Sequence, residues 1–564
     1  MAAETSASPA DDLLKLAEAR FPDLTEAERR LLHAVQVAMP ARGGENLKDD
    51  DPNNDPSKAE KWGPERSIRT YLLRWLCVDR DAKARVDPQG IWVHAARIEG
   101  PLDLAFVTVP FPLIFQRCRL TADADLTEVD IRALYLNGSW VRRINADGAK
   151  VKGSVMLREG FHAEGEVRLV GAQIGGNLEC DGSTFRNAAR EKSNIGGTAL
   201  QAAGISVAGN VFLRDGFRAE GAVWLIGAQI GGSLQCNGGT FRNPLIETNA
   251  DSGTALQAAR ISVTGSVFLR DGFSAEGVVG LLGSQIGGDL NCRRGTFSEL
   301  NIHSATIKGN FYWSDEPRPK LAKLDLRNAS VASIMDDELS WPDPGNLFLD
   351  GFVYGRISAG PTGAGERLKW IELQPEFKPQ PYRQLAKVLR ESGDDDGARY
   401  VLYRMEDRRQ QEDRSYFLRW FLRVTVGHGY YPLRSLWGLG LISVLGWIIY
   451  RRAHLAGAMA PTDKDAYQWS RTNHSPPPHY EGFVPLAYSV ENSLPLVQLG
   501  QAQRWQPDPN PQSVVLPAGK WIRRVLRLTT SPRFLRGFLW VQIILGWILA
   551  TLFAAGVSGI LRRD

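Results

Sequence analysis

The feature that most constrains this chain is a 56-residue repeat in its middle. Segments that begin at Gly153, Gly209 and Gly265 align closely, starting with GSVMLREGF, GNVFLRDGF and GSVFLRDGF. Within each segment, pairs of apolar residues alternate with polar ones about every eleven residues, as in short strands with one buried face. Such self-similarity predicts a solenoid, in which each repeat buries its apolar face against its neighbours.

The same spacing extends the solenoid on both sides of the repeat, so we assign residues 88–358 to one β-helix. Two half-coils make a coil of about 21 residues, and the coils stack at about 4.8 Å. The repeat equals four half-coils plus an insertion, found at 186–197 and again at 242–253. Both insertions fall on one edge of the solenoid, where they are either a binding face or tolerated surface loops.

The five cysteines fit a reduced, cytoplasmic solenoid, since no secretory signal precedes them. Cys180, Cys236 and Cys292 recur with the repeat, so neighbours in this series are two coils, or about 10 Å, apart. That distance is too long for a disulfide or for one shared zinc ion. We expect these residues to be small buried hydrophobic side chains.

Residues 1–87 predict a helical cap with an acidic linker. Thr25 and Glu28 form the pattern of a capping box at the start of a helix. The linker places acidic and amide side chains at the spacing of a calcium loop. The candidate ligands are Asp49, Asp51, Asn53 and Glu60. Because Asn54 stands where such a loop needs glycine, a solvated acidic linker is the favoured interpretation.

Residues 359–430 predict a helical hairpin followed by a basic, aromatic helix. That composition suits the headgroup surface of a membrane. The candidate interface residues are Arg414, Trp420 and Arg423 before the first apolar segment, and Arg451 and Arg452 after it. Nucleic acid would also attract these charges, but their place beside an apolar segment favours the membrane.

Residues 431–564 predict a membrane domain with two transmembrane helices. The first is Leu436–Tyr450, extended back to Pro432, and the second is Phe538–Leu561. The loop between them covers 451–535. Two spans place both termini on one side, which we expect to be the cytoplasm. The predicted location is therefore the inner (plasma) membrane, with a multi-pass topology and the solenoid in the cytoplasm.

The segment 483–500, FVPLAYSVENSLPLVQLG, has the order of a pore loop in two-span cation channels. A short apolar helix precedes an extended stretch that ends in glycine, and a second span follows. The pore-loop candidates are Ser489, Glu491, Pro495, Gln498 and Gly500. Gln498 stands where such filters usually have glycine, and the alternative is a periplasmic amphipathic segment that packs on the spans.

Several sequence segments resemble those of a bacterial family of membrane proteins with a pentapeptide-repeat-like β-solenoid. They are ARIEGPLDL at 96–104, GAQIGGNLECDGSTF at 171–185 and PYRQLAKVLRESGDDDGARYVL at 381–402. The resemblance implies coils with four short sides. Members carry labels such as pentapeptide-repeat protein or membrane-associated oxidoreductase, so the resemblance implies no established activity.

The sequence shows no motif for catalysis or for a cofactor. It contains no HExxH, CxxC or phosphate-binding loop, so we predict no cofactor and no enzyme. The net charge of +4 is too balanced for a DNA mimic, and we expect no nucleic acid partner. We predict a membrane-anchored cytoplasmic scaffold for an unidentified protein partner. The alternatives are a homo-oligomeric, channel-like protein with a regulatory solenoid, and a membrane-associated oxidoreductase.

Overall fold

The computed structural model describes residues 9–44, 46–48, 51–187, 197–243, 253–315, 322–412, 416–511 and 530–558. The chain forms two compact units, Met1–Asp394 and Asp395–Asp564. The first unit holds a β-solenoid between helical ends, and the second is mainly helical.

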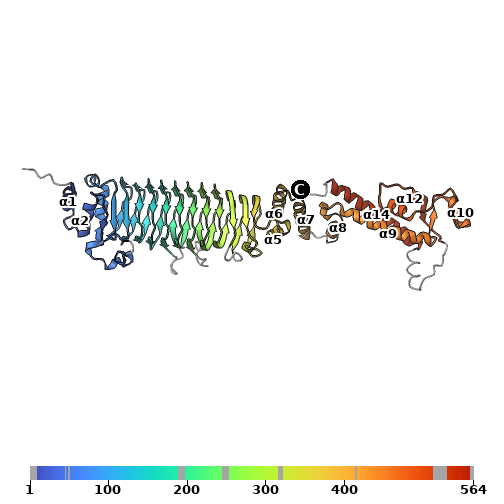
Figure 1. The fold of residues 1–564 in the computed structure, drawn as a ribbon, viewed down its shortest axis with the longest axis horizontal. Helices are drawn as coiled ribbons and strands as arrows, with labels where there is room; N and C mark the ends of the chain where they lie inside the picture. Colours follow the sequence, from blue (N-terminus) through green and yellow to red (C-terminus); the bar gives the residue numbers. More distant parts are fainter. Residues whose placement is uncertain are drawn as a thin grey trace, which may run out of the picture. The chain divides into compact units, whose positions relative to one another are not determined.

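The solenoid has about 11 turns, which confirms the predicted fold class at this level. It runs from β3 (Ile91–His94) to β40 (Val353–Ala359), and its strands join two parallel sheets of 21 and 19 strands. Figure 1 shows these strands stacked side by side along one axis. The first two coils of the repeat contain β15 (Val155–Met156), β16 (His162–Ala163), β17 (Val167–Arg168), β18 (Gln173–Ile174), β19 (Leu178–Glu179), β20 (Thr184–Arg186), β21 (Thr198–Gln201) and β22 (Ser206–Val207).

The strand register explains the repeat length. Val155 pairs with Leu178 one coil later, 23 residues along the chain, and Leu178 pairs with Val211 after 33 residues. The 56-residue repeat is therefore two coils, and the longer coil contains the insertion. The strands β20 and β28 (Thr240–Arg242), which lead into the two insertions, lie on the same face and both pair with β24 (Arg218–Glu220). The insertions thus leave one edge two coils apart, as predicted.

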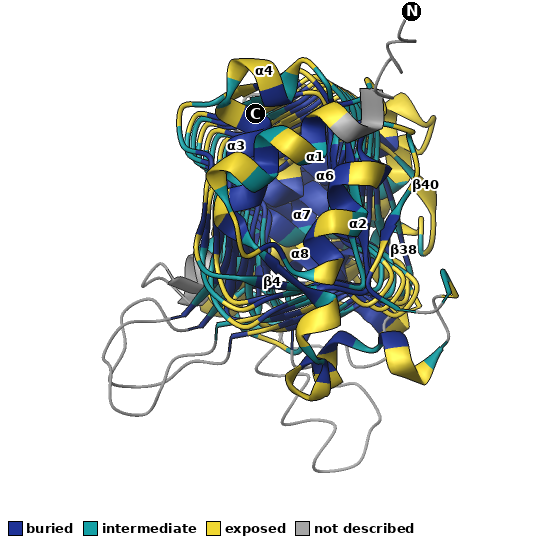
Figure 2. Ribbon diagram, turned by 90° about the vertical axis from the view of Figure 1, so that its left-hand side faces the viewer, coloured by how far each residue is buried: buried dark blue, intermediate teal, exposed yellow. Residues whose placement is uncertain are grey.

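Buried aromatic rings form a continuous ladder inside the solenoid. Six phenylalanines and one tryptophan stack with ring centroids 5.2–5.6 Å apart. They are Phe161, Phe185, Phe217, Phe241, Phe273, Phe297 and Trp313. Viewed along the solenoid, buried residues line the inside of the coils and exposed residues the outside (Figure 2). Each ring fills the space between its neighbours, so the core has the dense packing of a protein interior.

Polar side chains tie one corner of the solenoid together. Asn177 Oδ1 accepts from the Asn210 backbone N–H at 2.9 Å, and Asn210 Oδ1 accepts from the Ser233 N–H at 2.8 Å. The same contact recurs in further coils through Ser233, Ser266 and Asp289. These bonds satisfy backbone groups at the turns, where the strand ladders end.

The N-terminal helices close the first coil. They are α1 (Pro9–Arg20), α2 (Glu26–Ala34) and α3 (Thr70–Val78), and the predicted capping box of Thr25 and Glu28 begins α2. Glu28 is fully buried, and its carboxylate accepts from Arg69 Nε at 2.7 Å and Arg69 N at 3.0 Å. Burial alone would raise the pKa of Glu28, but the hydrogen bonds from Arg69 and Thr25 hold this pKa below its usual value.

The other end of the solenoid is closed by α5 (Ala364–Ile371) and α6 (Pro379–Glu391). Arg367 on α5 is fully buried and donates to both carboxylate oxygens of Asp336, at 2.7 and 2.5 Å. Its Nε also donates to the Pro361 carbonyl at 2.6 Å. Because both ends are covered, the terminal strands do not offer bare edges for pairing with another chain.

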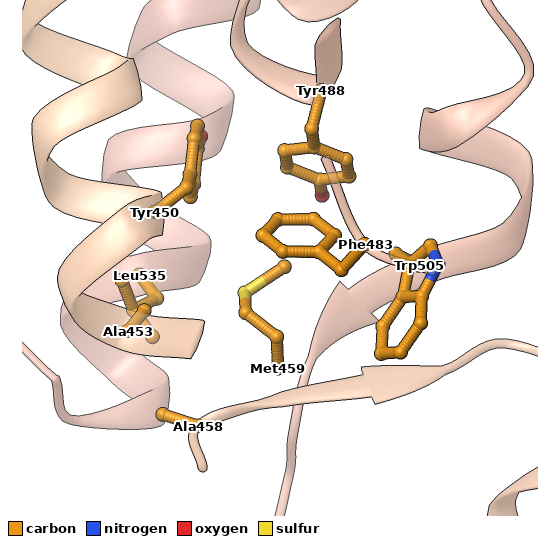
Figure 3. Packing of buried hydrophobic residues seen from close by; sticks show 8 residues of the cluster. All are labelled: Tyr450, Ala453, Ala458, Met459, Phe483, Tyr488, Trp505 and Leu535. Carbon is orange, nitrogen blue, oxygen red and sulfur yellow. The ribbon is translucent and has the colours of Figure 1, made fainter. Parts of the chain in front are cut away.

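The second unit begins with α7 (Asp395–Glu412) and α8 (Tyr416–Thr425) and contains two long apolar helices, α9 (Arg434–Leu455) and α14 (Pro532–Val557). The segment between them forms α10 (Lys464–Asn473), α11 (Pro485–Ser493), α12 (Gln501–Arg504) and a hairpin of β41 (Met459–Pro461) and β42 (Trp505–Pro507). Figure 3 shows its apolar core, where Phe483 and Tyr488 pack near Tyr450.

Among the described residues, one helix, α14, is long and apolar enough to cross a membrane. The predicted first transmembrane segment corresponds to α9, whose uncharged stretch, Ser435–Tyr450, is shorter, and the predicted second segment overlaps α14. Two-span topology therefore stays a proposal.

Candidate functional site

The second unit holds a buried polar network where α9, α11 and α14 meet. Gln542 of α14 is fully buried, and its Nε2 donates to Ser489 Oγ at 2.9 Å and to Ser493 Oγ at 2.8 Å. Gln542 Oε1 accepts from the Tyr450 hydroxyl at 2.8 Å. Ser489 Oγ donates to the Ser443 carbonyl of α9 at 2.7 Å. The network joins all three helices through side chains that have no contact with solvent.

Two glycines let α11 approach the long helices this closely. A Cβ on Gly446 of α9 would lie 2.2 Å from Ser489 Oγ, and a Cβ on Gly546 of α14 would lie 2.3 Å from the Ser493 carbonyl oxygen. No side chain fits at such distances. The C-terminal end of α11 is thus seated in a slot between α9 and α14.

That slot lies at mid-height of the helix pair. Ser443 is near the centre of the uncharged stretch Ser435–Tyr450, and Gly546 is near the centre of α14. The ring of Phe483, just before α11, lies 5.1 Å from that of His454 at the end of α9. At 1.5 Å per residue, α11 therefore descends about 13 Å from the end of the pair to its middle.

After α11 the chain turns back through residues 494–500, which we call the return loop. Gln501, directly after it, accepts from the Val484 N–H at 3.0 Å and donates to the Gly482 carbonyl at 3.3 Å, both at the start of α11. The return loop thus runs alongside α11, from its C-terminal end back to its N-terminal end. Its outer side is open, since Leu496 is 94% exposed.

The structure places the five pore-loop candidates around this junction. Ser489 lies on α11 within the network, while Pro495 and Gln498 lie in the return loop, where Gln498 is exposed. Glu491 accepts from the backbone N–H groups of Gly500, Gln501 and Ala502, at 3.2, 2.8 and 2.8 Å. Gly500 has a φ of 76°, a left-handed conformation that favours glycine. The expected short helix and terminal glycine are therefore present in that order, but Pro495 and Leu496 form a turn, so the stretch between helix and glycine is not extended throughout.

Sequence reasoning missed most of the network. Tyr450, Ser493 and Gln542 were not among the candidates, although Gln542 is an amide inside an otherwise apolar segment. Such a residue in a membrane helix is rare and usually faces a partner. That signal could have pointed to Gln542, but not to the serines that it contacts.

The outer faces of the two long helices are strongly apolar. Trp437 and Leu441 of α9 are 82% and 72% exposed, and Trp540, Ile544 and Trp547 of α14 are 64%, 58% and 56% exposed. The polar network, by contrast, is buried between the helices. This pair therefore has the reverse polarity of a helix pair that faces water.

The predicted interface residues have varied surroundings. Arg423 lies 3.7 Å from Asp407, and Trp420 is 53% exposed. Arg451 lies over the Trp447 ring, and Arg452 is exposed beside it. Arg414 lies outside the described residues.

The structure describes three of the four calcium-loop candidates, Asp51, Asn53 and Glu60. Asp51 accepts from the Asn53 N–H and from Asn46 Nδ2, so its carboxylate is used as a cap. Glu60 is exposed, and Asp49 lies outside the described residues. In the described part of the chain, no group of three or more His, Cys, Asp or Glu residues could hold a metal ion.

The cysteines are buried and free, as expected. Burial raises the pKa of Cys118 to about 12, and raises the pKa of Cys180 and Cys236 as well. A raised pKa disfavours the thiolate, which is the reactive form.

One outer face of the solenoid carries a row of apolar side chains. In-register pairs place Phe212, Gln235 and Phe268 next to one another on successive coils, while Val211, Leu234 and Val267 point inward. The apolar row consists of Trp92, Ile114, Tyr135, Met156, Phe212, Phe268, Tyr312 and Met335, and it is interrupted in the same register by Glu179, Gln235 and Asn291. Arg214 lies over the Phe212 ring at 4.3 Å.

A hydrogen bond joins the residues on the two sides of each insertion. Asn187 Nδ2 donates to the Thr198 carbonyl at 2.8 Å, and Asn243 Nδ2 donates to the Thr254 carbonyl at 2.7 Å. Residues 188–196 and 244–252 lie outside the described residues.

A wide cavity of about 810 Å³ lies beside α10, lined by Asp463, Trp469, His479 and Tyr480 among others. Asp463 already accepts from the Asp465 and Ala466 N–H groups as the cap of α10.

Comparison with known proteins gives no neighbour: no family model, curated protein or solved structure matches this chain. The fold and the site therefore define it as a β-solenoid protein with a separate unit of apolar helices.

Proposed function

We propose that this chain is a multi-pass membrane protein that holds a rigid β-solenoid in the cytoplasm as a scaffold for a protein partner. The reversed polarity of α9 and α14 carries this proposal. Lipid favours apolar side chains on the outside of a helix pair, and it favours polar groups that bond to each other inside. The exposed Trp437 and Trp540 and the buried Gln542 fit that environment.

In this arrangement α9 and α14 are the two spans of the inner (plasma) membrane. The uncharged stretch of α9 covers about 24 Å at 1.5 Å per residue. Local thinning of the bilayer and snorkelling by Arg434, Arg451 and Arg452 make up the remaining length. The segment that contains α10 and the hairpin then lies on the opposite side from the solenoid.

The scaffold role rests on the surface of the solenoid. The apolar row offers side chains that suit the apolar centre of a protein interface. The insertions at 186–197 and 242–253 leave a different edge, and they offer the variable loops that repeat proteins use for binding.

Crosslinking in cells, followed by capture of the full-length protein, tests this role. We expect the captured partner to be lost from a variant that lacks both insertions or from Phe212→Ser/Phe268→Ser. The matched control is Gln229→Ser/Gln285→Ser, which changes exposed residues on a different set of paired strands in the same sheet. If all variants capture the same partners, the scaffold assignment is wrong.

The descent of α11 to mid-height favours a second candidate function, a homo-oligomeric channel. A short helix that ends in mid-membrane and a segment that returns from there are the parts of a pore loop. The test is cation flux through liposomes that contain the purified protein, because an anchored scaffold alone produces none.

A further inference from the structure

The return loop has backbone groups that its own chain does not satisfy. Within the described residues, the N–H groups of Leu496, Gln498 and Leu499 have no hydrogen-bond partner. The carbonyl groups of Pro495 and Leu496 have none either. Water would serve these groups in a soluble protein, but lipid offers no donor or acceptor.

Neither long helix of the same chain covers the loop. Leu496 is 94% exposed and Leu499 is 49% exposed, although the loop directly follows the buried Ser493. Irregular backbone at membrane depth persists only where protein or a water-filled cavity covers it. Within the described part of the chain, two spans and one short helix cannot enclose such a cavity, so we look to other copies of the chain for the cover.

The charges and dipoles around the loop indicate the sign of the ion that it would bind. Helix α11 points its C-terminal end, which carries the negative end of the helix dipole, toward mid-height. Glu491 adds a carboxylate where the loop ends at Gly500. Backbone carbonyl oxygens are the ligands that replace the water of a monovalent cation in a filter. The helix end and the carbonyl oxygens favour a cation over an anion. Glu491 is already bonded to three backbone N–H groups, and the free N–H groups of the loop do not add to this preference.

We infer that copies of this chain assemble around the return loop, and that its carbonyl groups and Gln498 line a path for monovalent cations. The inference rests on the membrane placement proposed above and deepens the channel candidate. In a closed ring of identical copies, each copy uses the same two surfaces to contact its two neighbours, so no binding surface is left uncovered.

Crosslinking of full-length protein in its native membrane tests the assembly. Leu496→Cys is compared with Trp437→Cys, which places a thiol on the outer face of α9, and with the unmodified chain. The five native cysteines are buried, so they give little background. We expect a short thiol crosslinker to link two copies through position 496 and not through position 437.

Flux of potassium ions into liposomes tests the path. Gln498 is exposed, so its substitution leaves the folded core intact. We expect Gln498→Lys to lower the flux about tenfold or more, because a fixed positive charge in a narrow path repels cations. The matched control is Gln468→Lys on α10, which adds the same charge at an exposed position outside the path and should keep the flux near that of the unmodified protein.

The outcomes separate the two proposals. Crosslinking at 496 with a flux that Gln498→Lys blocks supports the inference. A protein that resists alkaline extraction from membranes but is monomeric, or assembles without flux, overturns the inference and leaves the anchored scaffold. A protein that alkaline extraction releases overturns the proposed membrane function itself.

Discussion

Replacing Gln542 with leucine should release α11 from its slot. Gln542 Nε2 shares its two hydrogens among Ser489 O, Ser489 Oγ and Ser493 Oγ, and its Oε1 accepts from the Tyr450 hydroxyl, which gives about three full hydrogen bonds to other helices. Leucine has a similar volume but makes none of them. Hydrogen bonds between membrane helices are worth about 0.6 kcal/mol each on average, so the loss should be about 2 kcal/mol. That loss corresponds to about a thirtyfold change in an opening equilibrium.

A thiol placed at Ala453 makes this opening measurable. Ala453 is fully buried in the core of the second unit, and the native cysteines all lie in the first unit. In the Ala453→Cys background, Gln542→Leu should speed maleimide labelling in detergent about thirtyfold. Ser443→Ala is the matched control, because Ser443 Oγ bonds only to Leu439 O of its own helix. Rates that differ less than twofold between Gln542→Leu and its parent would refute the role of the network.

Three further predictions concern the first unit. Phe217→Ala should lower the free energy of unfolding of the solenoid by about 3–5 kcal/mol, because it leaves a cavity between the rings of Phe185 and Phe241. The outward-facing Phe212→Ala should cost much less, and equal costs in denaturant titrations would argue against the ladder. Since its folded pKa is lowered, Glu28 should stabilise the folded state above its unfolded pKa of about 4.3 and lose that effect as the pH falls. The stability gap between the native chain and Glu28→Gln should therefore close in acid, and a gap that does not change with pH would contradict this. The cysteine thiols should not react with Ellman's reagent at pH 8 in the folded protein and should react after denaturation, because all five are buried and burial raises the pKa of Cys77, Cys118, Cys180 and Cys236. Fast reaction in the folded state would show that the thiols are accessible.

The solenoid could be predicted because its information is local and repeated. Val155, Leu178 and Val211 occupy equivalent positions, so a single spacing in the sequence determines every coil. The same spacing located the insertions, since a coil of 33 residues among coils of 23 has only one place for the extra residues. The recurring cysteines followed from the same register.

The polar network could not be predicted in this way. Tyr450, Ser489 and Gln542 come from three segments that share no sequence pattern. Hydrogen bonds between residues so far apart in the sequence produce no periodicity that could reveal them. The pore-loop order did find α11 and the return loop. It did not show that Gly446 and Gly546 make room for α11, because a small residue in an apolar helix predicts close contact with another helix but does not identify that helix.

The central claim is tested most directly by measuring on which side of the membrane the solenoid and α10 lie. Lys308→Cys puts an exposed thiol on the solenoid, and Gln468→Cys puts one on α10, between the proposed spans. A membrane-impermeant maleimide added to intact spheroplasts should label position 468 at once and position 308 only after the membrane is opened. Labelling of both positions from the same side would contradict the two-span anchor.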